Sequence, residues 1–210
     1  MKLICMKKFL GIYFFFIPFY AISQSLTPIE DEETHKIGFL NEKGDTVVPF
    51  VYDKVHMLYH YEFRNGICKV AKKDSGFGYI DTMGKEFIPC KYAYLGDESE
   101  GLIGAIPYEG SFSHANKYLN RNGEIVLDSI YAWPHDFHSG LAVCRSSNGK
   151  YGYINKNGVW VIPPIYDYAY GFKDGLAKVS ILPENFNGNY ITDIPYFYID
   201  TKGEKIILPK

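Results

Sequence analysis

The densest group of potential metal ligands in the sequence is the segment from His135 to His138, His-Asp-Phe-His. Two histidines at this spacing suit one face of a helix, yet no third group of ligands accompanies the pair. The acidic run from Asp97 to Glu100 offers oxygen ligands but lacks the glycine pattern of a calcium loop. We therefore expect no metal site, and we interpret the acidic run as a solvated turn.

Cysteines and carboxylates complete the set of side chains that could perform chemistry. Cys68 and Cys144 stand where related segments carry alanine or valine, so we expect them to be buried thiols. Serine nucleophile elbows and phosphate-binding glycine loops are absent from the sequence. A hydrolase would have to use carboxylates such as Glu109 and Glu184. The sequence predicts no catalytic residue and no cofactor.

The composition excludes two broad classes. The 210 residues are 47% hydrophobic and 22% charged, as in globular chains and unlike disordered ones. The formal net charge of -2 provides no basic surface for nucleic acid.

The N-terminal residues are typical of a secretory signal peptide. Lys7 and Lys8 precede an apolar run from Phe9 to Ile22, which at 14 residues is shorter than a membrane-spanning helix. Ser23 provides a small residue before a cleavage site. We predict a signal peptide over residues 1–23, a linker over 24–36, and a mature protein that is exported to the periplasm, cell surface or medium without spanning a membrane. An uncleaved anchor is the alternative.

The rest of the chain is a tandem repeat. Five segments share an aromatic residue, a branched residue, an Asn or Asp, and a glycine three positions later. These turn glycines are Gly44, Gly84, Gly123, Gly158 and Gly203. They are separated by 40, 39, 35 and 45 residues, a period that indicates a repeat architecture. A second block, Gly-Leu-Ala-x-Val in its best form, begins at Gly66, Gly101, Gly140 and Gly175.

Each unit is predicted to contain a β-hairpin and a further strand. In the fourth segment, Asn155 can accept a hydrogen bond from the backbone two residues on, and Gly158 can take the left-handed conformation that closes the hairpin. A proline five residues after three of the turn glycines is expected to end the second strand. The Gly-Leu-Ala block supplies the further strand. Hairpins are expected near residues 38–49, 78–89, 117–128, 152–163 and 197–208.

A tyrosine eight residues after four of the turn glycines is expected to pack in the core, because a unit of this size must bury its faces against its neighbours. These tyrosines are Tyr52, Tyr92, Tyr131 and Tyr166.

This pattern resembles the WG β-repeat family of bacterial proteins, whose units run aromatic-Gly-aromatic-Ile-Asp-x-x-Gly and continue with a branched pair, proline and tyrosine. The best match extends from Tyr151 to Gly158, and the segment from Phe77 to Asp81 is close to it. No Trp-Gly dipeptide occurs, so the chain is similar to a diverged member. The resemblance implies a repeat domain over residues 37–210 with an interaction role and without catalytic residues.

Two architectures fit such repeats, a closed propeller and an open array of β-sheets. The chain has four Gly-Leu-Ala strands for five hairpins, and neither terminus offers the missing strand that would close a ring. We therefore predict an all-β, open, solenoid-like array of short antiparallel strands, with a propeller-like arrangement as the alternative.

Three insertions, around residues 56–61, 107–115 and 183–195, interrupt the regular spacing. Insertions in repeat proteins form loops that often carry the binding face. The last two fall in the same connection of their units and mix aromatic rings with amides, hydroxyls and carboxylates, which suit a glycan or a protein partner. The predicted binding residues are Tyr108, Glu109, Phe112, His114, Glu184, Phe186, Asn187, Asn189 and Tyr190.

Three functions remain. The favoured one is an exported, non-enzymatic scaffold that binds a protein or glycan partner through the inserted loops. The second is a structural or assembly component of the cell envelope that pairs with partners through its sheet edges. The third, and the least supported, is a hydrolase that depends on loop carboxylates.

Overall fold

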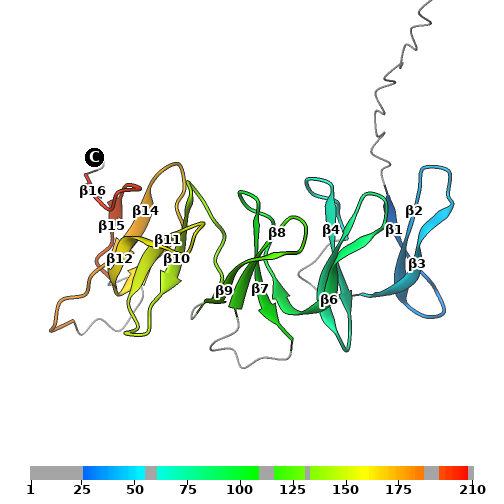
Figure 1. Ribbon diagram of the computed structural model, residues 1–210, viewed down its shortest axis with the longest axis horizontal. Helices are drawn as coiled ribbons and strands as arrows, with labels where there is room; N and C mark the ends of the chain where they lie inside the picture. Colours follow the sequence, from blue (N-terminus) through cyan, green and yellow to red (C-terminus); the bar gives the residue numbers. More distant parts are fainter. Residues whose placement is uncertain (1–25, 55–60, 109–115, 131–132, 187–193, 208–210) are drawn as a thin grey trace, which may run out of the picture.

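A computed structural model of the chain describes residues 26–54, 61–108, 116–130, 133–186 and 194–207 (Figure 1). These residues form β-strands and turns without any α-helix, which confirms the predicted all-β class. Accordingly, this part of the chain contains no apolar helix of the length that a bilayer requires. The signal peptide predicted for residues 1–23 lies outside the described residues.

The strands form five successive units, numbered I to V in chain order. Unit I contains β1 (Thr27–Glu30), β2 (Lys36–Leu40) and β3 (Thr46–Asp53). Unit II contains β4 (Ile67–Lys72), β5 (Gly76–Asp81) and β6 (Glu86–Leu95). Unit III contains β7 (Leu102–Pro107), β8 (Asn116–Asn120) and β9 (Ile125–Ile130). Unit IV contains β10 (Leu141–Arg145), β11 (Tyr151–Asn155) and β12 (Trp160–Tyr166), which is followed by the short β13 (Tyr168–Ala169). Unit V contains β14 (Ala177–Ser180), β15 (Phe197–Ile199) and β16 (Lys205–Ile206).

The units lie in a row, with unit I at one end and unit V at the other (Figure 1). Within each sheet, neighbouring strands follow the chain order and pair antiparallel. The first half of β6 pairs with β5 and its second half with β7, which joins units II and III into one six-stranded sheet. No sheet of the described residues closes into a barrel. The open array is confirmed, and the propeller-like alternative is not observed.

The hairpin turns share one hydrogen-bond pattern, as predicted. In unit II, Asp81 Oδ1 accepts hydrogen bonds from the backbone N–H groups of Met83 and Lys85, each at 2.9 Å. Gly84 then takes a φ of +79°, in the left-handed region that favours glycine. The turn glycines of the other units behave alike, with φ values from +76° to +85°.

The proline after the turn lies inside the second strand, and the prediction that it ends the strand is wrong. In unit II, β6 continues through Pro89 to Leu95. Between two paired positions of β5 and β6, β6 contributes two more residues than β5, so the proline lies in a bulge where the ladder needs no N–H. The bulged backbone approaches Gly78 so closely that a β-carbon there would lie 2.5 Å from the carbonyl oxygen of Ile88. The first glycine of the motif is therefore required by two backbones in close approach.

Unit III lacks both the first glycine of the motif and the proline after the turn. Lys117 takes the place of this glycine and Asp128 the place of the proline. The corresponding bulge of β9 contains one extra residue instead of two. The glycine thus accompanies the larger bulge.

The Gly-Leu-Ala strands are confirmed as β4, β7, β10 and the region of β14, and each begins in a second kind of tight turn. Before β4, Asn65 and Gly66 have φ values of +51° and +79°. Arg64 and Ile67 exchange two backbone hydrogen bonds, of 2.9 and 3.0 Å. Left-handed conformations at both central residues are typical of a two-residue hairpin turn. The same bridge precedes the other three strands.

Unit I obtains its third strand from the segment that the sequence indicated as a linker. β1 pairs with β2 from Thr27 opposite Leu40 to Glu30 opposite Ile37. The interpretation of residues 24–36 as a linker is therefore wrong for this strand. The first hairpin has the same three-stranded form as the next three units, without the Gly-Leu-Ala pattern.

The hydrophobic core lies between successive units. One cluster joins Phe39 of unit I with Val70 and Ile80 of unit II. Three further clusters join unit II with III, III with IV, and IV with V. Burial between neighbours is what stabilises a repeat array. The recurring tyrosines are buried there as predicted, except Tyr131, which lies outside the described residues. They are Tyr52, Tyr92 and Tyr166.

A second set of tyrosines, at the second aromatic position of the motif, fastens each unit to the connection that follows it. In three units, the tyrosine hydroxyl donates a hydrogen bond to a backbone carbonyl 17 residues further along the chain. The pairs are Tyr79 with Gly96 at 2.7 Å, Tyr118 with His135 at 2.6 Å, and Tyr153 with Tyr170 at 2.8 Å.

Candidate functional site

The predicted binding residues lie in two separate parts of the array. Tyr108 follows β7 and is half exposed, whereas Glu184 and Phe186 follow β14 in a turn closed by a bond from the Phe186 N–H to the Pro183 carbonyl. Units III and V are separated by unit IV, so the structure does not bring these two groups together (Figure 1). The remaining predicted residues lie outside the described residues. They are Glu109, Phe112, His114, Asn187, Asn189 and Tyr190.

An exposed aromatic surface adjoins the third insertion. We define the tyrosine patch as Tyr168, Tyr170, Tyr196 and Lys178. Tyr170 and Tyr196 meet at 5.7 Å between ring centroids, with their hydroxyl oxygens 3.2 Å apart. The Lys178 ammonium lies 4.1 Å from the centroid of the Tyr196 ring, within the range of a cation–π contact. Because Tyr196 directly follows the insertion, the patch borders this loop.

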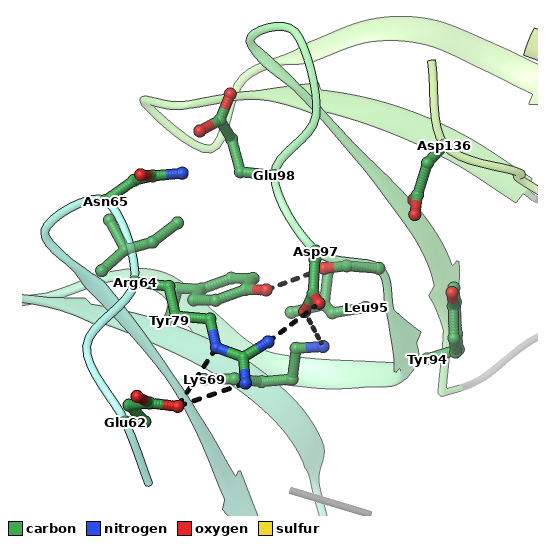
Figure 2. A pocket seen from close by; sticks show the side chains of 12 residues that line it. Glu62, Arg64, Asn65, Lys69, Tyr79, Tyr94, Leu95, Asp97, Glu98 and Asp136 are labelled. Atoms are coloured by element: carbon green, nitrogen blue, oxygen red, sulfur yellow. Dashed lines mark hydrogen bonds and ion pairs between the residues drawn. The ribbon is translucent and has the colours of Figure 1, made fainter. Parts of the chain in front are cut away.

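A charged cleft of about 450 Å³ lies between units II and III (Figure 2). The turn before β4 supplies Glu62 and Arg64, and β4 itself supplies Lys69. The segment after β6 supplies Asp97 and Glu98, and Asp136 reaches the cleft from the segment that precedes β10. The rings of Tyr79 and Tyr94 also line the cleft. The cleft therefore combines residues from four separate stretches of the chain.

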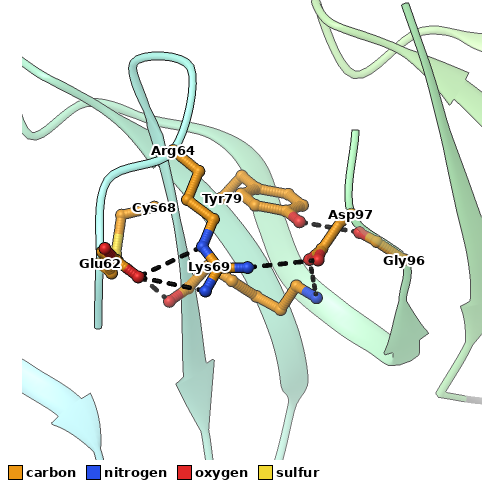
Figure 3. A network of polar contacts seen from close by, with 7 residues as sticks. All are labelled: Glu62, Arg64, Cys68, Lys69, Tyr79, Gly96 and Asp97. Atoms are coloured by element: carbon orange, nitrogen blue, oxygen red, sulfur yellow. Dashed lines mark hydrogen bonds and ion pairs between the residues drawn. The ribbon is translucent and has the colours of Figure 1, made fainter. Parts of the chain in front are cut away.

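Most charges in the cleft are paired with one another (Figure 3). Lys69 Nζ lies 3.0 Å from Asp97 Oδ1, and its side chain is only 9% exposed. Arg64 contacts Glu62 at 3.1 Å and Asp97 at 3.8 Å. The hydroxyl of Tyr79 donates to Gly96 O at 2.7 Å, which fixes the ring at the base of the network.

Asp136 differs from the other carboxylates of the cleft. Its carboxylate has no hydrogen bond or ion pair with any residue that the structure describes. Burial, and then the negative charge of Asp97, raise the pKa of Asp136 above its ordinary value of 3.8. The carboxylate lies against the backbone at Gly96, where a β-carbon would be 3.2 Å from its Oδ1 atom. An added positive charge in the cleft would therefore stabilise the ionised form.

The His135–His138 segment contributes structure instead of ligands. The backbone carbonyl of His135 accepts the hydroxyl of Tyr118. The His135 side chain is exposed, although partial desolvation by its neighbours lowers the pKa of the ring. Across the described residues, no three His, Cys, Asp or Glu side chains converge in a way that could hold a metal ion.

The acidic run is an exposed turn, as predicted, but it also fastens unit III to unit IV. Ser99 Oγ donates to the Phe137 carbonyl at 2.5 Å. Glu100 accepts the N–H of Gly140 at 3.1 Å and pairs with Lys156 at 3.1 Å. These contacts account for both side chains without a bound cation.

The described cysteines are free and buried. Burial raises the pKa of Cys68 to about 12, and that of Cys144 to about 11. A thiol in this state is a poor nucleophile, because the thiolate is the reactive form.

Sequence reasoning missed the cleft, although one signal was present. Glu62, Asp97 and Asp136 each stand four residues before the glycine of a Gly-Leu-Ala block. Equivalent positions of stacked units fall on one side of the array, and all three carboxylates line the cleft. The equivalent residue before β14 is Gly171, so this position carries no carboxylate in the last unit.

Comparison with known proteins agrees with the repeat geometry. No curated protein matches the chain. The family described as WG containing repeat matches at residues 37–74, 77–105, 118–151 and 151–181, which is more than half of the sequence. These matches begin with the first hairpin and end one residue after β14, and they confirm the resemblance seen in the motif. The chain belongs to the WG-repeat family.

Proposed function

We propose that this protein is an exported, non-enzymatic scaffold that binds a protein or glycan partner at the third insertion and the adjoining tyrosine patch. The observation that carries this proposal is the patch itself. Tyr168 and Tyr170 are 41% and 48% exposed, whereas the described motif tyrosines of units I to IV, such as Tyr52, Tyr79 and Tyr118, are buried. Exposed rings with polar edges are typical of surfaces that stack on sugars or anchor a protein partner.

The scaffold keeps these rings in place. Tyr168 and Ala169 form β13, which pairs with β14. Asp167 accepts the Leu182 N–H at 2.9 Å, and Ser180 Oγ donates to Pro195 O at 2.9 Å, so both ends of the insertion are held by the sheet. A partner would therefore meet rings that need little ordering on binding, which lowers the entropic cost of association.

The absence of a catalytic role is part of the proposal and is supported by the chemistry of the described side chains. The thiols are protonated because of burial, and the carboxylates Glu62 and Asp97 are held in ion pairs. Export is proposed from the basic and apolar N-terminal residues. N-terminal sequencing of the protein recovered from the producing cells would test it, and a chain that begins at Gln24 is the expected result.

The binding proposal is tested with the mature chain on a glycan array and against immobilised envelope proteins. Tyr170→Ala with Tyr196→Ala should abolish binding while the melting temperature stays within a few degrees of the parent. Met83→Ala provides the control, because Met83 is 76% exposed on a turn of unit II, away from the patch.

Retention of binding by the double tyrosine variant would contradict the proposal. If a partner is captured as before by a chain that lacks residues 184–194, the sheet edges become the better explanation, as in an assembly component. Turnover of a glycan or peptide that is lost on replacing one carboxylate would instead indicate a hydrolase.

A further inference from the structure

We propose that the cleft between units II and III binds a lysine or arginine side chain of a basic peptide, with Asp136 as its counter-ion. This site is separate from the tyrosine patch and does not depend on the function proposed for it. The argument rests on the charge balance of the cleft, the position of Asp136 and the shape of the lining.

The charge balance favours a cation. Four carboxylates line the cleft, those of Glu62, Asp97, Glu98 and Asp136, against the two cations Arg64 and Lys69. Both cations are already paired with Asp97, and Arg64 also with Glu62. An anionic ligand would have to displace these pairs, whereas a cationic one would add to them. The protein's net charge of -2 has the same sign.

Asp136 is the group that a cation would meet. Figure 2 shows its side chain directed toward the cleft from the side opposite Arg64 and Glu62. Burial and the charge of Asp97 disfavour the ionised carboxylate, and their effect outweighs the weaker opposing influence of His138, Lys69 and His135. A guanidinium or ammonium group at this place would form a charge-assisted hydrogen bond with Asp136 and offset the cost of keeping its carboxylate ionised.

The lining suits a long side chain better than a metal ion. Its carboxylates do not converge as three ligands, in agreement with the lack of a metal-ion grouping among the described residues. The rings of Tyr79 and Tyr94 provide apolar surface for a methylene stem. Tyr94 is itself supported by Trp133, with ring centroids 4.6 Å apart. A volume of about 450 Å³ accommodates one such side chain and part of its backbone.

The repeat changes at the next step, so the same arrangement does not recur between units III and IV. Gly104 occupies in unit III the position that Lys69 occupies in unit II. There Pro134 packs against the glycine, with its carbonyl oxygen 2.7 Å from where a β-carbon would stand. The cleft between units II and III is therefore expected to bind one basic side chain, and the equivalent step between units III and IV is not.

The test uses fluorescein-labelled hexapeptides in anisotropy titrations at about 0.15 M salt, one of alternating arginine and glycine and one of alternating glutamate and glycine. The parent chain should bind the arginine peptide and not the glutamate peptide. Asp136→Asn should weaken arginine-peptide binding at least about tenfold, because it removes the counter-ion. Asp74→Asn makes the same change of net charge at an exposed turn and should leave the affinity unchanged.

Three results would overturn the proposal. They are a parent chain that does not bind the arginine peptide, an Asp136→Asn variant that binds it as tightly as the parent, and an equal loss in Asp136→Asn and Asp74→Asn. The last would mean that only the net charge matters. Because Asn has nearly the shape of Asp, the variant should fold, and an unchanged thermal melt verifies this. Loss of the tyrosine patch should not alter the result, which separates this test from that of the proposed function.

Discussion

Removal of one tyrosine hydroxyl tests how the units are fastened together. Tyr79 is buried and donates to Gly96 O at 2.7 Å, and phenylalanine at this position would retain the ring while leaving the carbonyl without its donor. A net hydrogen bond is worth about 1 kcal/mol, and an unsatisfied buried acceptor adds to the loss. We therefore expect Tyr79→Phe to lower the free energy of unfolding by about 1–2 kcal/mol. In a chain of this length, that corresponds to a decrease of about 2–8 °C in melting temperature.

The repeat supplies a matched control for this variant. Tyr198 occupies the same motif position in unit V, is 37% exposed, and makes no hydrogen bond with the described residues. Tyr198→Phe should change the unfolding free energy by less than about 0.5 kcal/mol. Urea unfolding followed by circular dichroism gives both values. The reasoning is refuted if the two substitutions cost the same, or if Tyr79→Phe costs nothing.

Three further predictions follow from the same geometry. Gly152→Ala should lower the free energy of unfolding in urea by about 1–3 kcal/mol, because its β-carbon would lie 2.5 Å from a carbonyl oxygen of the bulged strand. Lys117→Ala, at the same position of the smaller bulge, should lower it by less than about 1 kcal/mol. Equal losses would rule out the bulge explanation. The three buried cysteines should react with a thiol reagent at pH 8 only after unfolding, and rapid labelling of the native protein would contradict their raised pKa values. The hydrogen bond from Lys36 Nζ lowers the pKa of Asp53 below 3.8, so this carboxylate stabilises the fold above that pH, and the stabilisation is lost as the pH falls through the folded pKa. Asp53→Asn should therefore be less stable than the parent at pH 7 and approach its stability under strongly acidic conditions. A difference in unfolding free energy that does not change with pH would count against this pairing.

The hairpins could be predicted from the sequence because their signals are local. An Asn or Asp followed three positions later by glycine specifies the turn through bonds of the kind that Asp81 makes. The Gly-Leu-Ala strands could be predicted equally well, because Gly66 and its equivalents mark a tight turn. Both features depend on residues that are near neighbours in the chain.

The remaining features depend on contacts between distant residues. The bulge at Pro89 depends on the close approach of its backbone to Gly78, which lies on the neighbouring strand. β1 carries no Gly-Leu-Ala pattern, and its pairing with β2 decides its role. The cleft arises because stacking of the units brings Asp136 beside Lys69 and Asp97. The next unit has Gly104 at the position of Lys69. A single repeat unit contains no sign of the cleft.

The central claim, an open row of five stacked units, is tested most directly by pulsed electron spin resonance distances between hairpin turns. Spin labels would be placed in pairs at residue 43 and at each of its equivalents, residues 83, 122, 157 and 202, all of which are exposed. The buried native cysteines should not interfere. The structure predicts that the distance from residue 43 increases at every step and is greatest for residue 202 (Figure 1). A distance to residue 202 that is shorter than the distance to residue 122 would mean that the units close into a ring and would contradict the account.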